Sequence, residues 1–293
     1  MTDTNSTYVN LLPHNWKDVV SSWLNEDAPS FDYGGYVVGT TFETAKLYIK
    51  ASGVVAGIPF FDQVFRLLGC KVEWLIMEGD KITLNTGEQK RCIAYVTGNT
   101  NSILLGERPA LNMIARASGI ATKSRHLLEL KEKHNWHGII AGTRKTTPGF
   151  RIVEKYAMLV GGVDTHRMDL STMIMLKDNH IKAAGDIQKA VNKARSVGGF
   201  SLKIEVETSS YEEAKTAILA GADIIMLDNF TCDEIKVVSK KLKDDFKDKK
   251  FFLEGSGGLT EHNCVDYFCE GLDILSFGSL SQSVGHIDFS LKL

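Results

Sequence analysis

Residues 203–228 read KIEVETSSYEEAKTAILAGADIIMLD, and this stretch decides the fold. An apolar run at 203–207 precedes a segment whose apolar residues recur at intervals of three and four, and a second apolar run closes the stretch at 223–228. Intervals of three and four are typical of a helix, whereas short continuous apolar runs are typical of strands buried on both faces. The stretch therefore predicts a strand, a helix and a second strand parallel to the first.

The same alternation continues on both sides of this stretch. Further apolar runs, separated by helical segments, occupy residues 138–143, 173–178, 250–256 and 273–278. Capping boxes, in which a Ser or Thr precedes a Glu by three residues, mark helix starts at Ser209 or Ser210 and at Thr231. Six such strands joined by helices favour a parallel α/β barrel over a doubly wound sheet.

The first hundred residues follow a different pattern. Strand-like runs separated by Gly-rich turns occupy 46–57, 70–79, 81–84 and 91–98, and a helix is expected over 59–69. This pattern favours a smaller N-terminal α+β sandwich domain, which we place at 1–115, with the barrel domain at 116–284. A long helix is expected over about 101–134, and the alternating tail at 285–293 is expected to join the first domain as a strand.

Composition and charge exclude several classes of protein. The 293 residues carry a net charge of -2 and a mean hydropathy of -0.09, so there is no basic field to hold nucleic acid or an anionic membrane. We expect neither as a partner. Five scattered cysteines without a CxxC pair, and a start without a signal-peptide pattern, indicate a reducing compartment. The expected location is the cytoplasm, with the nucleus as an alternative.

Charged side chains gather where the predicted barrel strands end, which is the functional face of a parallel barrel. The early ends are basic and the later ends acidic: Arg144, Lys145, His166, Arg167 and Lys177, then Glu205, Glu207, Asp228 and Glu254. The basic half suits a ligand with several negative groups, because an arginine fork matches carboxylate or phosphate. The acidic half suits sugar hydroxyls, or magnesium held together with a pyrophosphate.

Small residues follow the last two strands. EGSGGL at 254–259 and FGSLSQ at 277–282 would expose backbone N–H groups, as a phosphate cradle does, and barrel enzymes frequently bind phosphate at this place. Structural roles stay open for other polar residues. Glu205 could equally face solvent or pair with Lys203, and Asn179 and His180 could equally cap a loop.

Six strings carry a resemblance to a known family: ERPALNMIARASGIAT (107–122), GTRKTTPGFR (142–151), HRMDLSTMIMLKDNH (166–180), EVE (205–207), MLDNF (226–230) and EGSGG (254–258). In this order they resemble quinolinate phosphoribosyltransferase, also called nicotinate-nucleotide pyrophosphorylase, and most closely its eukaryotic form. The resemblance implies that quinolinate and phosphoribosyl pyrophosphate give nicotinate mononucleotide, pyrophosphate and carbon dioxide, with magnesium, in de novo NAD biosynthesis. It also implies an α/β barrel and an N-terminal sandwich domain.

The resemblance implies a role for each basic residue at the early strand ends. Arg144, Arg167 and Lys177 are expected to bind the two carboxylates of quinolinate, with His166 beside them. Lys145 is expected to face these carboxylates or the pyrophosphate.

The acidic and glycine-rich positions receive roles in the same way. Glu207 and Asp228 are expected near the ribose and magnesium, as direct or indirect metal ligands. The expected cradle for the 5′-phosphate consists of Ser256, Gly257, Gly258 and Gly278. The expected catalytic residues are Lys145, Lys177, Glu207 and Asp228.

Arg108 matches an arginine that enters the active site of a neighbouring subunit, so the resemblance implies a homo-oligomer. A dimer at least is expected, with a hexamer as an alternative. Pro109 departs from the family pattern inside an expected helix, where the missing N–H could kink or start the helix.

Two other functions remain open. A Schiff-base aldolase would use Lys177 at its strand end to form an imine, although nearby arginines favour a charged lysine that pairs with anions. A non-catalytic phosphoribosyl sensor could share the fold, although both acidic strand ends are intact. A related transferase acting on nicotinate, which has one carboxylate, is the nearest enzyme to exclude.

Overall fold

The computed structural model describes residues 8–293, which form two compact units. Unit 1 takes the chain up to residue 125 together with 146–162 and 283–293, and unit 2 takes 126–145 and 163–282. This grouping differs from the predicted boundaries in two respects. The boundary at 115 falls inside one continuous helix, α4 (Thr100–Lys133), and residues 146–162 join unit 1. The helix within 146–162 packs there, since Tyr156 meets the Phe60 ring edge-on at 5.3 Å.

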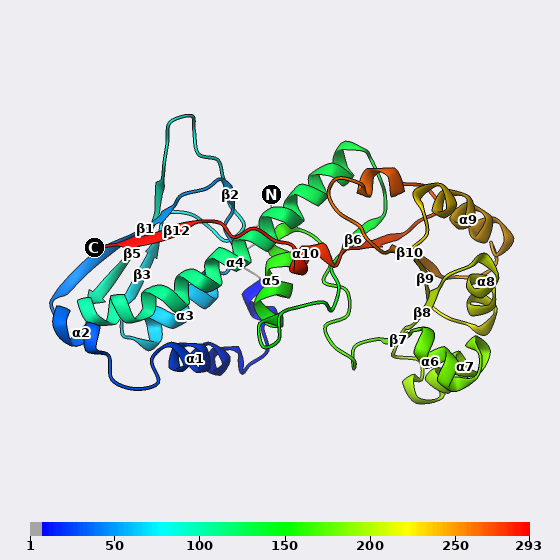
Figure 1. The fold of residues 1–293 in the computed structure, drawn as a ribbon, viewed down its shortest axis with the longest axis horizontal. Coiled ribbons are helices and arrows are strands. Elements are labelled where there is room, and N and C mark those ends of the chain that lie inside the picture. Colours follow the sequence, from blue (N-terminus) through cyan, green and yellow to red (C-terminus); the bar gives the residue numbers. More distant parts are fainter. Residues whose placement is uncertain (1–7) are drawn as a thin grey trace. The chain divides into compact units, whose positions relative to one another are not determined.

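Unit 1 is built on an antiparallel sheet in the order β12-β1-β5-β3 (Figure 1). Its strands are β1 (Phe42–Ile49), β3 (Lys71–Trp74), β5 (Arg91–Asn99) and β12 (Phe289–Lys292), and a second small sheet pairs β2 (Gly53–Val54) with β4 (Lys81–Ile82). β12 pairs with β1 from Lys46 opposite Lys292 to Ile49 opposite Phe289. The last strand of the described chain therefore pairs with the first one.

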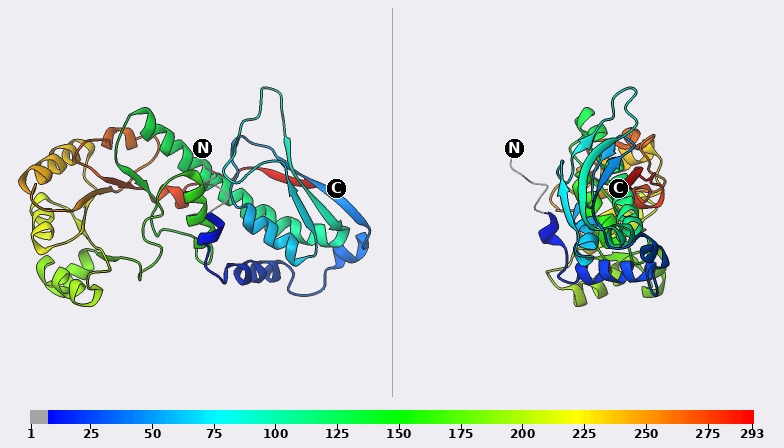
Figure 2. Two further views of the ribbon diagram at one scale, coloured as in Figure 1. Left: turned by 180° about the vertical axis from the view of Figure 1, so that it is seen from behind. Right: turned by 90° about the vertical axis from the view of Figure 1, so that its left-hand side faces the viewer.

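The remaining elements of unit 1 are η1 (Tyr8–Leu11), α1 (Trp16–Asp27), α2 (Tyr33–Val38), α3 (Ile58–Leu67), α4 and α5 (Arg151–Gly161). α3 lies beside α4 in the views of Figures 1 and 2. Pro109 lies inside α4, and the helix continues through it. The proline therefore neither begins nor ends the helix that carries Arg108.

The start of α3 is held by a carboxylate from a distant part of the chain. Glu78 accepts hydrogen bonds from the backbone N–H of Gly57 at 2.7 Å and of Ile58 at 2.9 Å. These N–H groups have no partner inside the helix, so the carboxylate satisfies them. Burial raises the pKa of Glu78 to about 7, although the two hydrogen bonds act in the opposite direction.

Unit 2 is a curved parallel sheet in the order β6-β11-β10-β9-β8-β7. Its strands are β6 (Ile139–Ala141), β7 (Ile174–Leu176), β8 (Ile204–Thr208), β9 (Ile224–Asp228), β10 (Phe252–Ser256) and β11 (Ile274–Ser276). The predicted barrel-type α/β fold is confirmed. Within residues 8–293 no ladder joins the edge strands β6 and β7, and Asp164 adds a single parallel bridge to Ala141 of β6.

Helices cover the outer side of this curved sheet (Figures 1 and 2). They are α6 (Asp178–Ala184), α7 (Ile187–Gly198), α8 (Tyr211–Ala220) and α9 (Cys232–Asp245), and the shorter η2 (Cys264–Tyr267) and α10 (Ser279–Gln282) complete the unit. Local sequence fixes their starts. Ser210 accepts a hydrogen bond from the Glu213 N–H, and Thr231 forms the predicted capping box with Glu234. None of the described helices could cross a membrane, being too short or too polar.

Candidate active site

The carboxyl ends of neighbouring strands in unit 2 bring opposite charges into contact. Lys177 directly follows β7, and its Nζ lies 2.7 Å from Oε2 of Glu207 near the end of β8. The lysine side chain is 47% exposed and that of the glutamate 18%. The pair therefore lies at an open edge of the sheet, where a ligand can reach both groups.

Asp228, the last residue of β9, shares this edge. Burial raises the pKa of the Asp228 carboxyl, the negative charge of Glu207 raises it further, and the charges of Lys177 and Lys145 act in the opposite direction. Two carboxylates and two ammonium groups thus meet at one place. The carboxylate is also oriented, because its Oδ2 accepts a hydrogen bond from Nδ2 of Asn229 at 2.7 Å.

The basic half of the site contains two guanidinium groups that repel each other electrostatically. Burial lowers the pKa of Arg167, the nearby charge of Arg144 lowers it further, and Glu205 opposes both. The Arg167 guanidinium also approaches Met173 O at 3.5 Å and Met175 Sδ at 3.3 Å. Two like charges held together favour an anionic ligand, and a ligand with two negative groups can satisfy both forks.

The glycine-rich loop after β10 lies against Asn229. Gly257 has φ +108, and a Cβ at this position would lie 2.3 Å from Asn229 Oδ1. Asn229 in turn donates its backbone N–H to Ser256 O at 2.9 Å. At Gly278, after β11, a Cβ would lie 3.0 Å from Cδ of Lys145. Because Gly257 and Gly278 have no side chains, the backbone of their two loops can pack close to the edge that carries Asp228 and Lys145.

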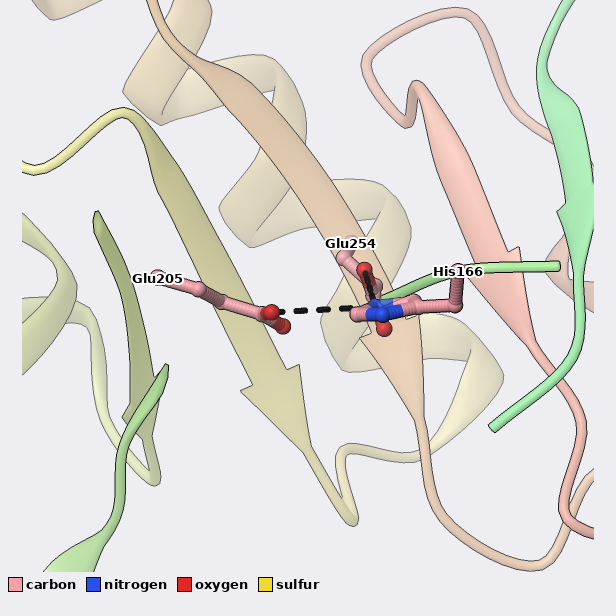
Figure 3. Close-up of side chains that lie close together, drawn as sticks. All are labelled: His166, Glu205 and Glu254. Atoms are coloured by element: carbon pink, nitrogen blue, oxygen red, sulfur yellow. Dashed lines mark hydrogen bonds and ion pairs between the residues drawn. The ribbon is translucent and has the colours of Figure 1, made fainter. Parts of the chain in front are cut away.

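Beneath this edge, three side chains form a buried cluster (Figure 3). Glu205 of β8 and Glu254 of β10 point at His166 from the two sides of β9. Nε2 of His166 lies 3.1 Å from Oε2 of Glu254 and 3.6 Å from Oε2 of Glu205. Both glutamates are fully buried, and the histidine side chain is 8% exposed.

The register of the sheet places this cluster closer to the amino ends of the strands than the charged edge is. Glu205 pairs with Ile224, the first residue of β9, whereas Glu207 pairs with Met226. A cavity of about 370 Å³ is lined by His166, Arg167 and Glu254 together with first residues of strands, including Ile139, Ile224 and Ile274. The cluster therefore lies toward the amino ends of the strands.

The two buried carboxylates are incompletely satisfied. Both oxygens of Glu205 and Oε1 of Glu254 accept no hydrogen bond. Burial raises the pKa of Glu205 well above its ordinary value, and the neighbouring Glu254 raises it further. Donor atoms from the two carboxylates and from His166 lie within 4.8 Å of one another, which is close enough to hold a metal ion.

The structure gives the contacts of three residues whose roles the sequence leaves open. Glu205 faces neither solvent nor Lys203, whose ammonium lies 4.6 Å above the Phe252 ring. Asn179 and His180 lie in the first turn of α6, and His180 Nδ1 accepts a hydrogen bond from the Lys177 N–H at 3.0 Å. Their contacts are those of a helix start.

Not every predicted site residue lies in unit 2. Arg144, Lys145, Arg167, Lys177, Glu207, Asp228 and the cradle residues all do, whereas Arg108 lies on α4 in unit 1. Two contributions were missed by sequence reasoning, namely the orienting contact of Asn229 and the burial of Glu205. The second had a signal, because residues two apart on a strand share a face, so Glu205 points to the same side as Glu207.

Comparisons with known proteins identify the family. Residues 36–118 match the N-terminal domain of quinolinate phosphoribosyl transferase, and residues 120–292 match its C-terminal domain. The nicotinate-nucleotide pyrophosphorylase [carboxylating] of Dictyostelium discoideum is 50% identical over 285 residues, covering 94% of each chain. The human protein of that name is 46% identical, covering 94% of this chain and 90% of its own.

Solved structures agree with these matches. NadC from Streptococcus pyogenes has a TM-score of 0.86 and 34% identity, covering 96% of this chain and 97% of its own. Human nicotinic acid phosphoribosyltransferase, at 13% identity and a TM-score of 0.53, shares the fold alone. Fold and site thus define a phosphoribosyltransferase of the α/β-barrel type. The chain belongs to the quinolinate phosphoribosyltransferase family, which confirms the resemblance seen in the sequence.

Proposed function

We propose that the chain transfers a phosphoribosyl group to quinolinate with decarboxylation, giving nicotinate mononucleotide, pyrophosphate and carbon dioxide in de novo NAD biosynthesis. One observation carries the proposal. Two mutually repelling guanidinium groups, Arg144 and Arg167, belong to the same barrel unit as the Lys177–Glu207 ion pair and Asp228. The two arginines suit a dicarboxylate. The ion pair and Asp228 suit a ribose with a charged leaving group.

The residues act by position and charge. Arg144, Arg167 and Lys177 hold the two quinolinate carboxylates, with Lys145 facing these carboxylates or the pyrophosphate. As pyrophosphate leaves the anomeric carbon, positive charge develops on the ribose, and Glu207 and Asp228 stabilise that charge. The pyridine nitrogen attacks the anomeric carbon and becomes cationic. Loss of carbon dioxide from the carbon next to the nitrogen leaves an electron pair on that carbon, which the positive nitrogen stabilises. That carbon then takes up a proton from water, which gives nicotinate mononucleotide.

Glu207 and Asp228 also suit magnesium. One oxygen of each is engaged, Glu207 Oε2 by Lys177 and Asp228 Oδ2 by Asn229, and their mutual repulsion would be relieved by a cation. Magnesium is commonly held by one or two carboxylates together with substrate phosphates. When bound it would neutralise charge on the leaving pyrophosphate, whether the carboxylates hold it directly or through water.

The backbone at Ser256, Gly257, Gly258 and Gly278 would hold the 5′-phosphate, since a Cβ at Gly258 would meet nothing within 4 Å and the backbone there is open to a ligand. Arg108 would complete the site of a neighbouring subunit, in a dimer or a larger homo-oligomer. The cytoplasm remains the proposed location, with the nucleus as the alternative.

A direct assay tests the proposal. Incubation with quinolinate, phosphoribosyl pyrophosphate and magnesium should release carbon dioxide and form nicotinate mononucleotide, whereas nicotinate should not replace quinolinate. Arg167→Ala should weaken quinolinate binding by about a hundredfold or more, because removing one partner of a buried ion pair costs about 3–5 kcal/mol, while phosphoribosyl pyrophosphate binding changes little. Turnover of nicotinate alone, or an imine trapped by borohydride on Lys177, would refute it.

A further inference from the structure

Both ring nitrogens of His166 are engaged inside the protein. The backbone N–H of Arg167 donates to Nδ1 at 2.8 Å, and since a backbone N–H can only donate, Nδ1 carries no proton. The ring is therefore neutral with its proton on Nε2. That proton is donated to Oε2 of Glu254 at 3.1 Å. A ring in this state has no positive charge and no unused donor with which to bind an anionic ligand.

The backbone at His166 is also unusual. Its φ is +56, a left-handed conformation that is unfavourable for residues other than glycine. The turn is held by two contacts, because the His166 N–H donates to Asp164 Oδ1 at 2.6 Å and the ring accepts from the Arg167 N–H. The peptide that precedes the Arg167 side chain is thus fixed from both sides.

We propose that His166 is a positioning residue rather than a ligand of the substrate. It links the Arg167 peptide to the buried Glu254, and in this way sets the direction of the Arg167 guanidinium. The inference rests on the proposed function, in which Arg167 binds a carboxylate of quinolinate.

The two glutamates differ in their contact with His166. Glu254 lies on β10, between β9 and β11 in the sheet, and supplies the acceptor for the ring. Glu205 Oε2, at 3.6 Å from Nε2, is too far for a hydrogen bond. Glu254 is therefore the direct anchor of His166.

Calorimetry of quinolinate binding to the full chain separates positioning from direct contact. His166→Ala removes both contacts and should weaken binding about tenfold or more. His166→Asn should recover most of that loss, because an asparagine tolerates a positive φ, as Asn229 does at +58, and can accept the next N–H. Asn101 makes that contact in this chain, with Oδ1 2.9 Å from the N of Ser102.

Variants of the anchor give a second comparison. Glu254→Gln keeps an acceptor for Nε2 and should bind quinolinate nearly as the native chain does, whereas Glu254→Ala should bind it about tenfold more weakly. Glu213→Ala, which removes a carboxylate from the start of α8 in the same unit, should leave quinolinate affinity unchanged. All these variants should bind phosphoribosyl pyrophosphate as the native chain does. Far-ultraviolet circular dichroism checks that each is folded.

A spectroscopic measurement tests the state of the ring without any ligand. With histidine side chains labelled by ¹⁵N, the His166 signals, assigned by their loss in His166→Asn, should show one protonated and one unprotonated nitrogen near neutral pH. Two protonated nitrogens would overturn the inference. So would a stoichiometric metal ion in the purified protein whose removal by chelator shifts these signals, because the cluster would then be a metal site.

The two proposals can fail separately. If Arg167→Ala leaves quinolinate affinity unchanged, the proposed dicarboxylate site is wrong. If Arg167→Ala weakens quinolinate binding strongly while His166→Asn matches His166→Ala and both Glu254 variants match the native chain, only the positioning role is wrong. His166 would then contact the ligand directly.

Discussion

At the scale of single residues, Asp228 places a charged carboxylate in the site at the expense of the stability of the fold. Its pKa is raised, chiefly by burial and then by Glu207, so the folded state disfavours the ionised carboxylate. The unfolded chain releases this proton near the ordinary aspartate pKa of about 3.9, so the folded state holds more protons just above that pH. The free energy of unfolding therefore falls as pH rises through this window, and the cost persists at higher pH.

We predict that Asp228→Asn abolishes most turnover while raising the melting temperature at pH 7 by about 2 °C. The gain should disappear below about pH 4, where the native carboxyl is also protonated. Thermal unfolding at both pH values, together with turnover at saturating magnesium, measures this. Asp186→Asn is a matched control of opposite sign, because hydrogen bonds at the start of α7 lower the pKa of Asp186. An Asp228→Asn protein that retains native turnover would contradict the proposed role.

The positions of Lys177, Glu207 and Asp228 could be predicted from the sequence, because each stands at or near the end of an apolar run that forms a strand. The contacts of His166 could not. Its left-handed φ and its link to Glu254 depend on β10 and on a bridge to β6, which no local pattern specifies. The burial of Glu205 is different, because its place two residues before Glu207 on one strand puts both side chains on the same side of the sheet.

At the scale of elements, α3 depends on a carboxylate that lies outside the helix. The pKa of Glu78, about 7, exceeds the ordinary glutamate value, so stability should fall as pH rises from about 4.5 to 7, by at most about 1.4 kcal/mol per pH unit. Glu78→Gln should remove this slope while lowering stability overall, because an amide satisfies two N–H donors less well. Urea unfolding at pH 5, 6 and 7 measures both effects.

The control for Glu78 lies in the same unit. Hydrogen bonds from Arg91 and Asn85 lower the pKa of the half-buried Glu88 to about 2, so its titration lies below pH 5. Glu88→Gln should therefore leave the slope between pH 5 and 7 unchanged. A Glu78→Gln protein with the native slope would show that other groups cause it.

The long helix α4 and the three-residue strands β6, β7 and β11 were predicted, whereas the short helix α6 was not. The helix expected over about 101–134 is α4, at Thr100–Lys133, because apolar residues recur along its length. The seven-residue α6 was missed. Its start depends on the contact between His180 and the Lys177 N–H, which lacks the Ser, Thr, Asp or Asn signal of a helix start.

At the scale of the whole molecule, the proposed role of Arg108 predicts complementation between inactive chains. Arg108→Ala and Arg144→Ala should each abolish most activity. After mixing and subunit exchange, about half of the dimers would be hybrids with one intact site each, so roughly a quarter of the sites should recover. Turnover of the mixture against each parent measures this. No recovery under proven exchange would place Arg108 in the site of its own chain, or outside the site altogether.

The pairing of β12 with β1 has a consequence for biosynthesis. During translation β1 leaves the ribosome early, but its partner, Phe289–Lys292, emerges only after the whole of unit 2 has been made. Until then one edge of β1 exposes unpaired N–H and C=O groups, which is the kind of edge that promotes aggregation. The sheet of unit 1 therefore cannot be completed until the chain is finished. For most of the synthesis, the free edge of β1 would be accessible to chaperones that bind exposed strands.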